Sequence, residues 1–242
     1  MRRRGSCGSP RARSPGRGVA AAPRIRARLA LAIALVAPAL PGAARAQGIG
    51  GTVGGFNTQR RIYYESAVYE QTGLMYGGAG SLRLGPLLVE AGTLQGTLAG
   101  DGSTANADTK VRATTARAQI ALGPWARLGA QLESRRYEAD AGPTVWRLLG
   151  AAVHVEPGLS ITGLRGWADV AILPASLVSG GPKLKVAMQV AVGASFSPRR
   201  SPLNLRLGYR FERYDIEASG LAGERYEQFR GIVAEAGVRL GR

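Results

Sequence analysis

Apolar and polar residues alternate with a period of two along much of this chain, and this feature constrains its fold most. Successive side chains of a β-strand point to opposite faces, so such alternation indicates strands with two different faces. In residues 203–212 the odd-numbered positions are Leu, Tyr or Phe, whereas the even-numbered positions are Asn, Arg, Gly or Glu. Residues 184–196 and 231–240 divide in a similar way.

The same pattern, bounded by turn residues, predicts nine strands. They fall at 73–84, 87–98, 111–122, 126–138, 144–155, 159–172, 184–196, 203–216 and 226–240. We expect one more strand within 49–64, because an antiparallel barrel with both ends on one side needs an even number of strands. The prediction is an all-β, antiparallel, up-and-down transmembrane β-barrel of about ten strands, and the alternative is eight.

The connections between these strands are predicted to differ in length. Short turns are expected at Gly85-Pro86, Gly123-Pro124, Pro157-Gly158 and 197–202, and longer polar connections at 100–110, 139–143, 174–183 and 217–225. Short turns on one side and long loops on the other are typical of outer-membrane barrels.

The polar strand faces carry many charges. If they point inward, the lumen contains Arg83, Glu90, Arg117, Arg127, Glu133, Lys185, Arg206, Arg210, Glu212, Glu235 and Arg239, together with Gln131 and Gln189. These are too many charges for the core of a soluble sheet, and the strands exceed the usual soluble length of about five or six residues. A soluble secreted β-barrel or sandwich is the alternative that shares the alternation.

Aromatic residues lie near the predicted connections. Because amphipathic rings favour the headgroup level, we expect two interfacial girdles. Their predicted members are Trp125, Tyr137, Trp146, Phe196, Tyr214, Tyr226 and Phe229.

With these features, the part of the chain after residue 46 resembles the small outer-membrane β-barrel proteins of Gram-negative bacteria as a class. Proteins of that class usually end in an eight-residue motif. Its first position is polar, its third is Gly, its sixth and eighth are aromatic, and the other positions are unrestricted. Here Glu235 and Gly237 match, while Leu240 and Arg242 occupy the aromatic places. The resemblance implies a location in the cell outer membrane, a monomer, and three partners: outer-membrane lipid, periplasmic chaperones and the barrel-insertion machinery.

The N-terminal segment has the three parts of a secretory signal: a basic start, an apolar run at 29–40 and the exit Ala44-Arg45-Ala46. We predict a signal peptide over 1–46, cleaved after Ala46, and a barrel domain over 47–242. The leader contains ten of the 32 Lys and Arg residues and no Asp or Glu, so it carries most of the net charge of +16. The charge that remains does not favour nucleic-acid binding.

Few residues point to chemistry. The single cysteine, Cys7, lies in the leader, and the single histidine, His154, lies near a turn with Glu156 on the same strand face. We expect no metal or cofactor, and a non-enzymatic barrel with a structural or surface-contact role whose charged side chains fill a narrow lumen. The alternatives are a small, porin-like channel that favours anions, because arginines outnumber acids among the predicted inward charges, and a lipid-modifying hydrolase that uses His154 as its base.

Overall fold

The structure is a computed structural model. It describes residues 46–65, 67–103, 106–139, 142–159, 163–179, 183–198, 201–217 and 225–240. The predicted leader before Ala46 and the last position of the predicted C-terminal motif, Arg242, lie outside the described residues.

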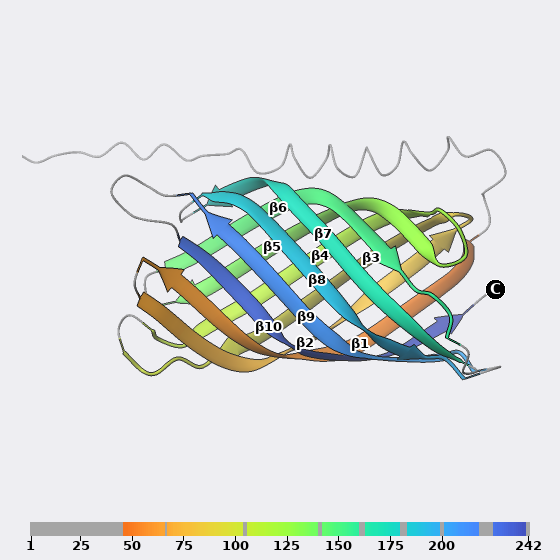
Figure 1. Cartoon of the computed structure of the whole chain (residues 1–242), viewed down its shortest axis with the longest axis horizontal. Coiled ribbons are helices and arrows are strands. Elements are labelled where there is room, and N and C mark those ends of the chain that lie inside the picture. The colour runs from red at the N-terminus through yellow and green to blue at the C-terminus, as the bar shows by residue number, and fades with distance from the viewer. Residues whose placement is uncertain are drawn as a thin grey trace, which may run out of the picture. The chain divides into compact units, whose positions relative to one another are not determined.

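Ten antiparallel strands follow one another around a closed barrel (Figure 1). They are β1 (Ala46–Tyr64), β2 (Ala67–Leu84), β3 (Leu87–Leu98), β4 (Thr109–Ala121), β5 (Ala126–Ala139), β6 (Gly142–Val155), β7 (Leu164–Ser179), β8 (Leu184–Phe196), β9 (Leu203–Ile216) and β10 (Arg225–Leu240). Each strand pairs with its neighbours in the chain, and β1 closes the barrel by pairing with β10 from Ile49↔Leu240 to Tyr64↔Arg225. The predicted all-β, up-and-down barrel is confirmed with ten strands, and the alternative count of eight is wrong.

The largest error in the strand bounds concerns β7. It was predicted at 159–172 but spans Leu164–Ser179. Residues 156–163 instead form the connection from β6, in which Gly163 has a φ of 83°. Beyond Ile172, Pro174 breaks the alternation and has no N–H to donate. The strand continues past it because the β6–β7 register shifts between Leu149 and Ala151, and such a bulge accommodates the missing hydrogen bond.

The connections at the two ends differ less than the sequence predicts. At the end away from the termini, 99–108 and 217–224 are long, but β5 and β6 are separated by residues 140 and 141 alone. At the end that carries the termini, the connection 156–163 is itself long. Many residues predicted to form loops instead extend the strands: β2 begins at Ala67 and β6 at Gly142.

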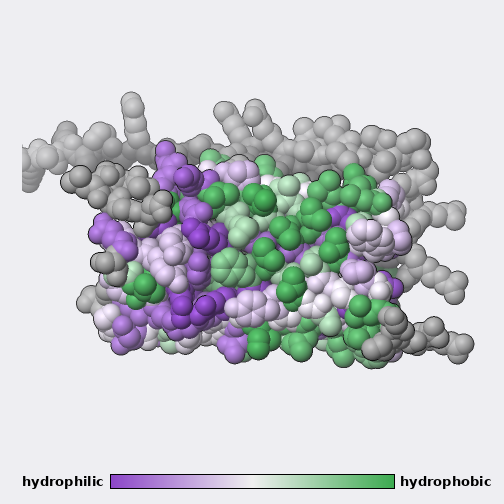
Figure 2. Space-filling view, viewed as in Figure 1, coloured by the Kyte–Doolittle hydropathy of each residue, from purple (hydrophilic) through white to green (hydrophobic). Residues whose placement is uncertain are grey.

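The outer wall of the barrel is apolar where a soluble protein would be polar. Leu207 is 60% exposed and Val53 is 66% exposed, and further exposed residues on the same wall are Leu74, Ile172 and Ile232. Figure 2 shows hydrophobic residues gathered along the middle and right of the viewed face and hydrophilic residues at the left, away from the C-terminus. An apolar band of this kind around a barrel is typical of a wall that contacts lipid.

The interior of the barrel is filled by side chains from every strand. Each strand contributes at least one buried apolar or aromatic residue: Phe56, Met75, Leu98, Val111, Tyr137, Trp146, Leu173, Ala187, Tyr214 and Phe229. A barrel of about eight strands is just wide enough for side chains to fill it, and ten strands add little to this width. The interior is therefore where the candidate site lies.

Candidate functional site: the barrel interior

Arg135 is the centre of the buried polar network. It lies on the inward face of β5 and is 2% exposed. Its Nε donates to Glu133 Oε1 at 2.9 Å and its Nη2 to Glu212 Oε2 at 2.6 Å. Glu212, on β9, also pairs with Arg210. Because both carboxylates are almost fully buried, each depends on these guanidinium groups for compensation of its charge.

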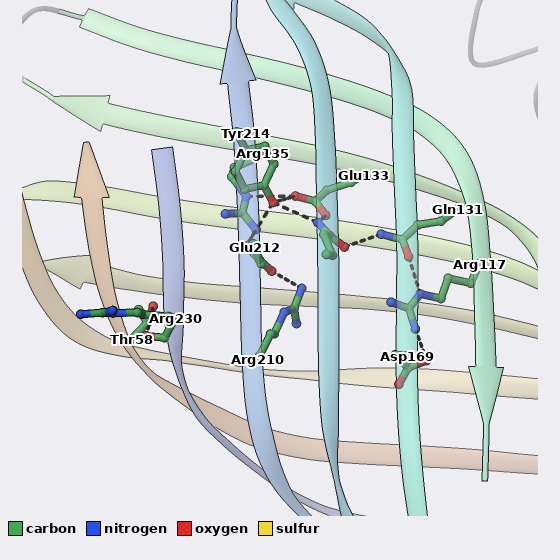
Figure 3. A network of polar contacts seen from close by, with 11 residues as sticks. Thr58, Arg117, Gln131, Glu133, Arg135, Asp169, Arg210, Glu212, Tyr214 and Arg230 are labelled. Carbon is green, nitrogen blue, oxygen red and sulfur yellow. Dashed lines mark hydrogen bonds and ion pairs between the residues drawn. The ribbon is translucent and has the colours of Figure 1, made fainter. Parts of the chain in front are cut away.

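A chain of hydrogen bonds leads from this centre across the barrel (Figure 3). The Tyr214 hydroxyl lies 3.0 Å from carboxylate oxygens of both Glu133 and Glu212. Gln189 donates to Tyr214 Oη at 2.9 Å and accepts from Gln131 at 2.7 Å. The side-chain oxygen Oε1 of Gln131 in turn accepts from Arg117 Nε at 2.7 Å. Strands that are not neighbours are thus tied together through the lumen.

The network continues to Asp169 on β7. Its Oδ1 accepts from Arg117 Nη1 at 3.1 Å and lies 3.0 Å from His154 Nδ1. Its Oδ2 accepts from Arg206 Nη2 at 3.5 Å, and Arg206 also reaches Glu235 at 3.4 Å. Three cationic or protonatable groups therefore surround one carboxylate, which favours its charged form inside the barrel.

A second polar group lies toward the end of the barrel away from the termini. Arg60 on β1 donates to Glu227 Oε2 through Nε and Nη2, at 3.1 and 2.7 Å, and to Gln71 Oε1 at 2.8 Å. Gln71 donates to Thr109 Oγ1 at 3.0 Å and to the Ala107 carbonyl at 2.6 Å. These bonds connect the interior to the connection 99–108.

Four aromatic rings form a closed circuit inside the barrel, and this corrects the predicted girdles. Tyr137 contacts Trp146 at 4.8 Å, Trp146 contacts Tyr214 at 5.6 Å, Tyr214 contacts Phe229 at 5.9 Å, and Phe229 returns to Tyr137 at 6.4 Å between ring centroids. The guanidinium of Arg135 lies 4.6 Å from the rings of both Tyr214 and Phe229. Assigning these four rings to an interfacial girdle was wrong, because all four are buried.

The other three predicted girdle residues have different surroundings. Trp125 and Phe196 are exposed beside connections at the end that carries the termini. Tyr226 stacks on Tyr63 with centroids 4.3 Å apart, near the opposite end. These positions are compatible with the interfacial placement expected for them.

The predicted lumen charges occupy three kinds of place. Glu133 and Glu212 are buried in the network. Arg117, Arg206, Arg210, Glu235, Glu90 and Arg239 line a cavity of about 210 Å³, and Arg83 and Arg127 line a second of about 110 Å³ toward the terminal end. Lys185 is the exception, since the register of β8 and β9 shifts between Leu184 and Val186. Leu184 is buried there and Lys185 is exposed, so the lumen-facing assignment of Lys185 is corrected.

The larger cavity exists because one side of its wall has few side chains. Gly50 and Gly54 on β1, Gly77 on β2 and Gly92 on β3 form that side. The opposite side presents Trp167, with the Arg206 guanidinium 4.2 Å from its ring. Arg117, Asp169 and Gln189 of the network also line this cavity, so the open part of the interior borders the dense network.

Several central residues were missed from the sequence, above all Arg135, Arg60, Glu227 and Asp169. Arg135 shares the strand face of Glu133, so the alternation itself carried the signal. The partners of Asp169 come from β4, β6 and β9, which alternation within one strand cannot identify.

His154 and Ser195 lie inside the barrel near the terminal end. Ser195 Oγ donates to Glu156 Oε1 at 2.9 Å, and His154 Nε2 lies 3.8 Å from Glu156 Oε2. Among the residues that the structure describes, no group of three or more His, Cys, Asp or Glu side chains is placed to hold a metal ion. In the same residues, no helix is long and apolar enough to cross a membrane.

A closed antiparallel barrel with an apolar wall and a charged interior defines the class of transmembrane β-barrels. Solved structures with this fold are outer-membrane barrels of Gram-negative bacteria. The outer-membrane protease OmpT from Escherichia coli matches with a TM-score of 0.51 and 8% identity over 81% of this chain and 97% of its own. The translocator domain of the autotransporter NalP from Neisseria meningitidis matches with a TM-score of 0.46 and 12% identity over 89% and 96%.

No protein-family model matches the sequence. No curated protein matches it either. The likeness to solved structures thus concerns the fold, which is shared by enzymes and by barrels without enzymatic activity.

Proposed function

We propose that this chain is a non-enzymatic β-barrel of the Gram-negative outer membrane with a structural or surface-contact role in the cell envelope. The observation that carries this proposal is the packed interior. The four-ring circuit and the Arg135 network fill the half of the lumen away from the termini with fully buried side chains. A barrel closed in this way acts through its wall and its rim.

Planar-bilayer recording tests the closed lumen. We expect the purified protein to give no unitary conductance steps, because Trp146, Tyr214 and Phe229 block the interior. A 16-stranded porin, whose barrel is wide enough for an aqueous channel, is the positive control. Steps of constant amplitude from the wild-type protein would contradict a closed barrel.

The second candidate is a narrow channel that favours anions. Arg83, Arg127 and Arg239 surround the smaller cavity, whose acidic lining residue is Glu90, so its mouth is cationic. If steps appear, their reversal potential in a KCl gradient decides this candidate. A reversal near the chloride potential would favour it over the closed barrel.

We also infer that the chain does not hydrolyse lipid. The contact of Ser195 supports this inference: its hydroxyl donates to Glu156, whereas Nε2 of His154, the nitrogen that a Ser-His-acid triad turns toward its serine, has no hydrogen-bond partner among the described residues. Ser195 is 1% exposed and points into the barrel, out of reach of an acyl ester on the outer wall. We expect His154→Ala to leave the envelope lipids unchanged by mass spectrometry, and a lipid species that depends on His154 would contradict the inference.

A further inference from the structure

Four cationic side chains form a basic patch on the outer wall of three neighbouring strands. They are Lys110 and Arg112 on β4, Arg136 on β5 and Arg147 on β6. All four residues are exposed. The residues that alternate with them point inward: Val111, Arg135, Tyr137, Trp146 and Leu148 are buried. The basic patch therefore faces the surroundings of the barrel and not its lumen.

The register brings like charges together in this patch. Arg112 lies directly opposite Arg136 in the β4–β5 ladder. Ser134 pairs with Arg147, which places Arg147 diagonal to Arg136. Like charges in directly opposed positions destabilise a sheet. An anion between the guanidinium groups would remove this repulsion.

Among the described residues, acidic side chains neutralise the patch only in part. Glu138 pairs with Arg136 at 2.8 Å and lies opposite Lys110. In the part of the chain that the structure describes, Arg112 and Arg147 have no acidic partner. Asp108, close to Lys110 in sequence, accepts instead from the Gly100 amide at 3.1 Å.

Two outward-facing arginines on the opposite side of the barrel differ in this respect. Arg61 pairs with Glu70 at 2.9 Å, and Arg213 pairs with Asp215 at 2.7 Å. Both pairs lie toward the same end of the barrel as the basic patch. Arg230 on β10 also faces outward and donates to Gln59 at 2.6 Å instead of to a carboxylate, so the patch is distinguished by the clustering of its four cations.

Apolar residues follow along the same strands toward the terminal end, after one polar row. Thr114 and Ser134 form a polar row beside the patch, and the next outward pair is Leu132 and Leu149. Further along, Ile120, Leu128 and Val153 are exposed. The patch therefore lies at the border of the lipid-facing band, where headgroups meet acyl chains.

We propose that the basic patch binds the phosphorylated, anionic headgroup of an outer-leaflet lipid, whose acyl chains lie over Leu132 and Leu149. Arginines bind phosphate through paired, charge-assisted hydrogen bonds, and Arg112, Arg136 and Arg147 are close enough in the ladder to share one headgroup. The inference rests on the proposed placement of the barrel in the outer membrane. It does not depend on whether the lumen conducts.

Native mass spectrometry of the full mature chain, refolded in zwitterionic detergent, tests the proposal. The probe is diphosphoryl lipid A, with phosphatidylcholine as the zwitterionic comparison. The double variant Arg112→Gln/Arg147→Gln removes the two arginines without acidic partners, and Arg61→Gln/Arg213→Gln is the matched control. We expect the first variant to lose at least about tenfold in lipid A retention and the control to retain it like the wild type.

Thermal unfolding of the same samples gives a second readout that does not depend on retention. Without lipid, Arg112→Gln/Arg147→Gln is expected to be as stable as the wild type or more stable, because like charges have been removed. With lipid A, only the wild type and the control variant should gain stability. A loss of fold in the double variant would be visible in the lipid-free sample.

Three results would overturn the proposal. The first is that the double variant retains lipid A as well as the wild type does. The second is that the wild type binds phosphatidylcholine as tightly as lipid A. The third is that inorganic phosphate stabilises the wild type as much as lipid A does, which would indicate a site for a free anion. Conductance steps from the same preparation would overturn the closed lumen instead and leave the lipid site standing.

Discussion

Arg135 and Arg136 are adjacent in the chain but have opposite environments. Arg135 compensates two buried carboxylates in the lumen, whereas Arg136 is exposed beside Glu138 on the outer wall. The alternation of a single strand creates this difference. How much an arginine of this barrel contributes to stability therefore depends on whether its strand position faces the lumen or the outer wall.

This difference predicts unequal costs of substitution. Arg135→Met leaves Glu133 and Glu212 buried with less compensation, and we expect it to lower the free energy of unfolding by about 3–5 kcal/mol. Arg136→Gln breaks an exposed pair and should cost about 1 kcal/mol or less. Urea titration of the refolded barrel in detergent micelles measures both, and equal effects would contradict the role assigned to Arg135.

The positions of the aromatic rings were predictable in part from the sequence. Tyr137 shares the face of Glu133, and Tyr214 shares the face of Glu212, so strict alternation predicts both rings inside the barrel. The prediction of a girdle relied on how close these rings lie to the connections and not on the strand face that alternation gives them. The contact between Arg135 on β5 and Glu212 on β9 was not predictable in the same way, because it requires the closed barrel.

At the scale of the strand, glycines set how closely neighbouring backbones approach. A Cβ on Gly77 of β2 would lie 1.8 Å from the carbonyl oxygen of Thr93 on β3. A Cβ on Gly80 of the same strand would have nothing within 4 Å. The β2–β3 ladder therefore depends on the first glycine and not on the second.

The two glycines make a matched test of this ladder. We expect Gly77→Ala to lower stability by about 1–3 kcal/mol because backbone atoms must shift, whereas Gly80→Ala should leave stability nearly unchanged. The midpoint of urea unfolding in micelles is the measurement. A larger loss from Gly80→Ala than from Gly77→Ala would show that the ladder is not the limiting element.

Strand positions were predicted well where alternation was unbroken. β3, β8 and β9 have the predicted bounds, Leu87–Leu98, Leu184–Phe196 and Leu203–Ile216. Errors arose where the pattern was interrupted. One place is Pro174 in β7, and the other is the first residues of β2, where charged and aromatic residues alternate less regularly. Strand ends that extend beyond the apolar band have no apolar–polar alternation, so their bounds could not be predicted from the sequence.

At the scale of the whole molecule, the distribution of polarity is reversed relative to a soluble protein. The wall exposes Val53, Leu74 and Leu207, while Glu133, Arg135 and Glu212 are buried. Water would not favour such a wall, because large exposed apolar areas promote association. A lipid environment accounts for both faces at once.

Cell fractionation shows whether the apolar wall contacts the outer membrane. The full-length chain, which includes the predicted leader, is expressed in a Gram-negative host and followed through separation of inner and outer membranes, and then by gel electrophoresis with and without heating. We predict recovery with the outer membrane after carbonate washing, and a band whose mobility changes on heating as the closed barrel of β1 to β10 unfolds. Recovery of a folded protein in the soluble periplasmic fraction would contradict the account.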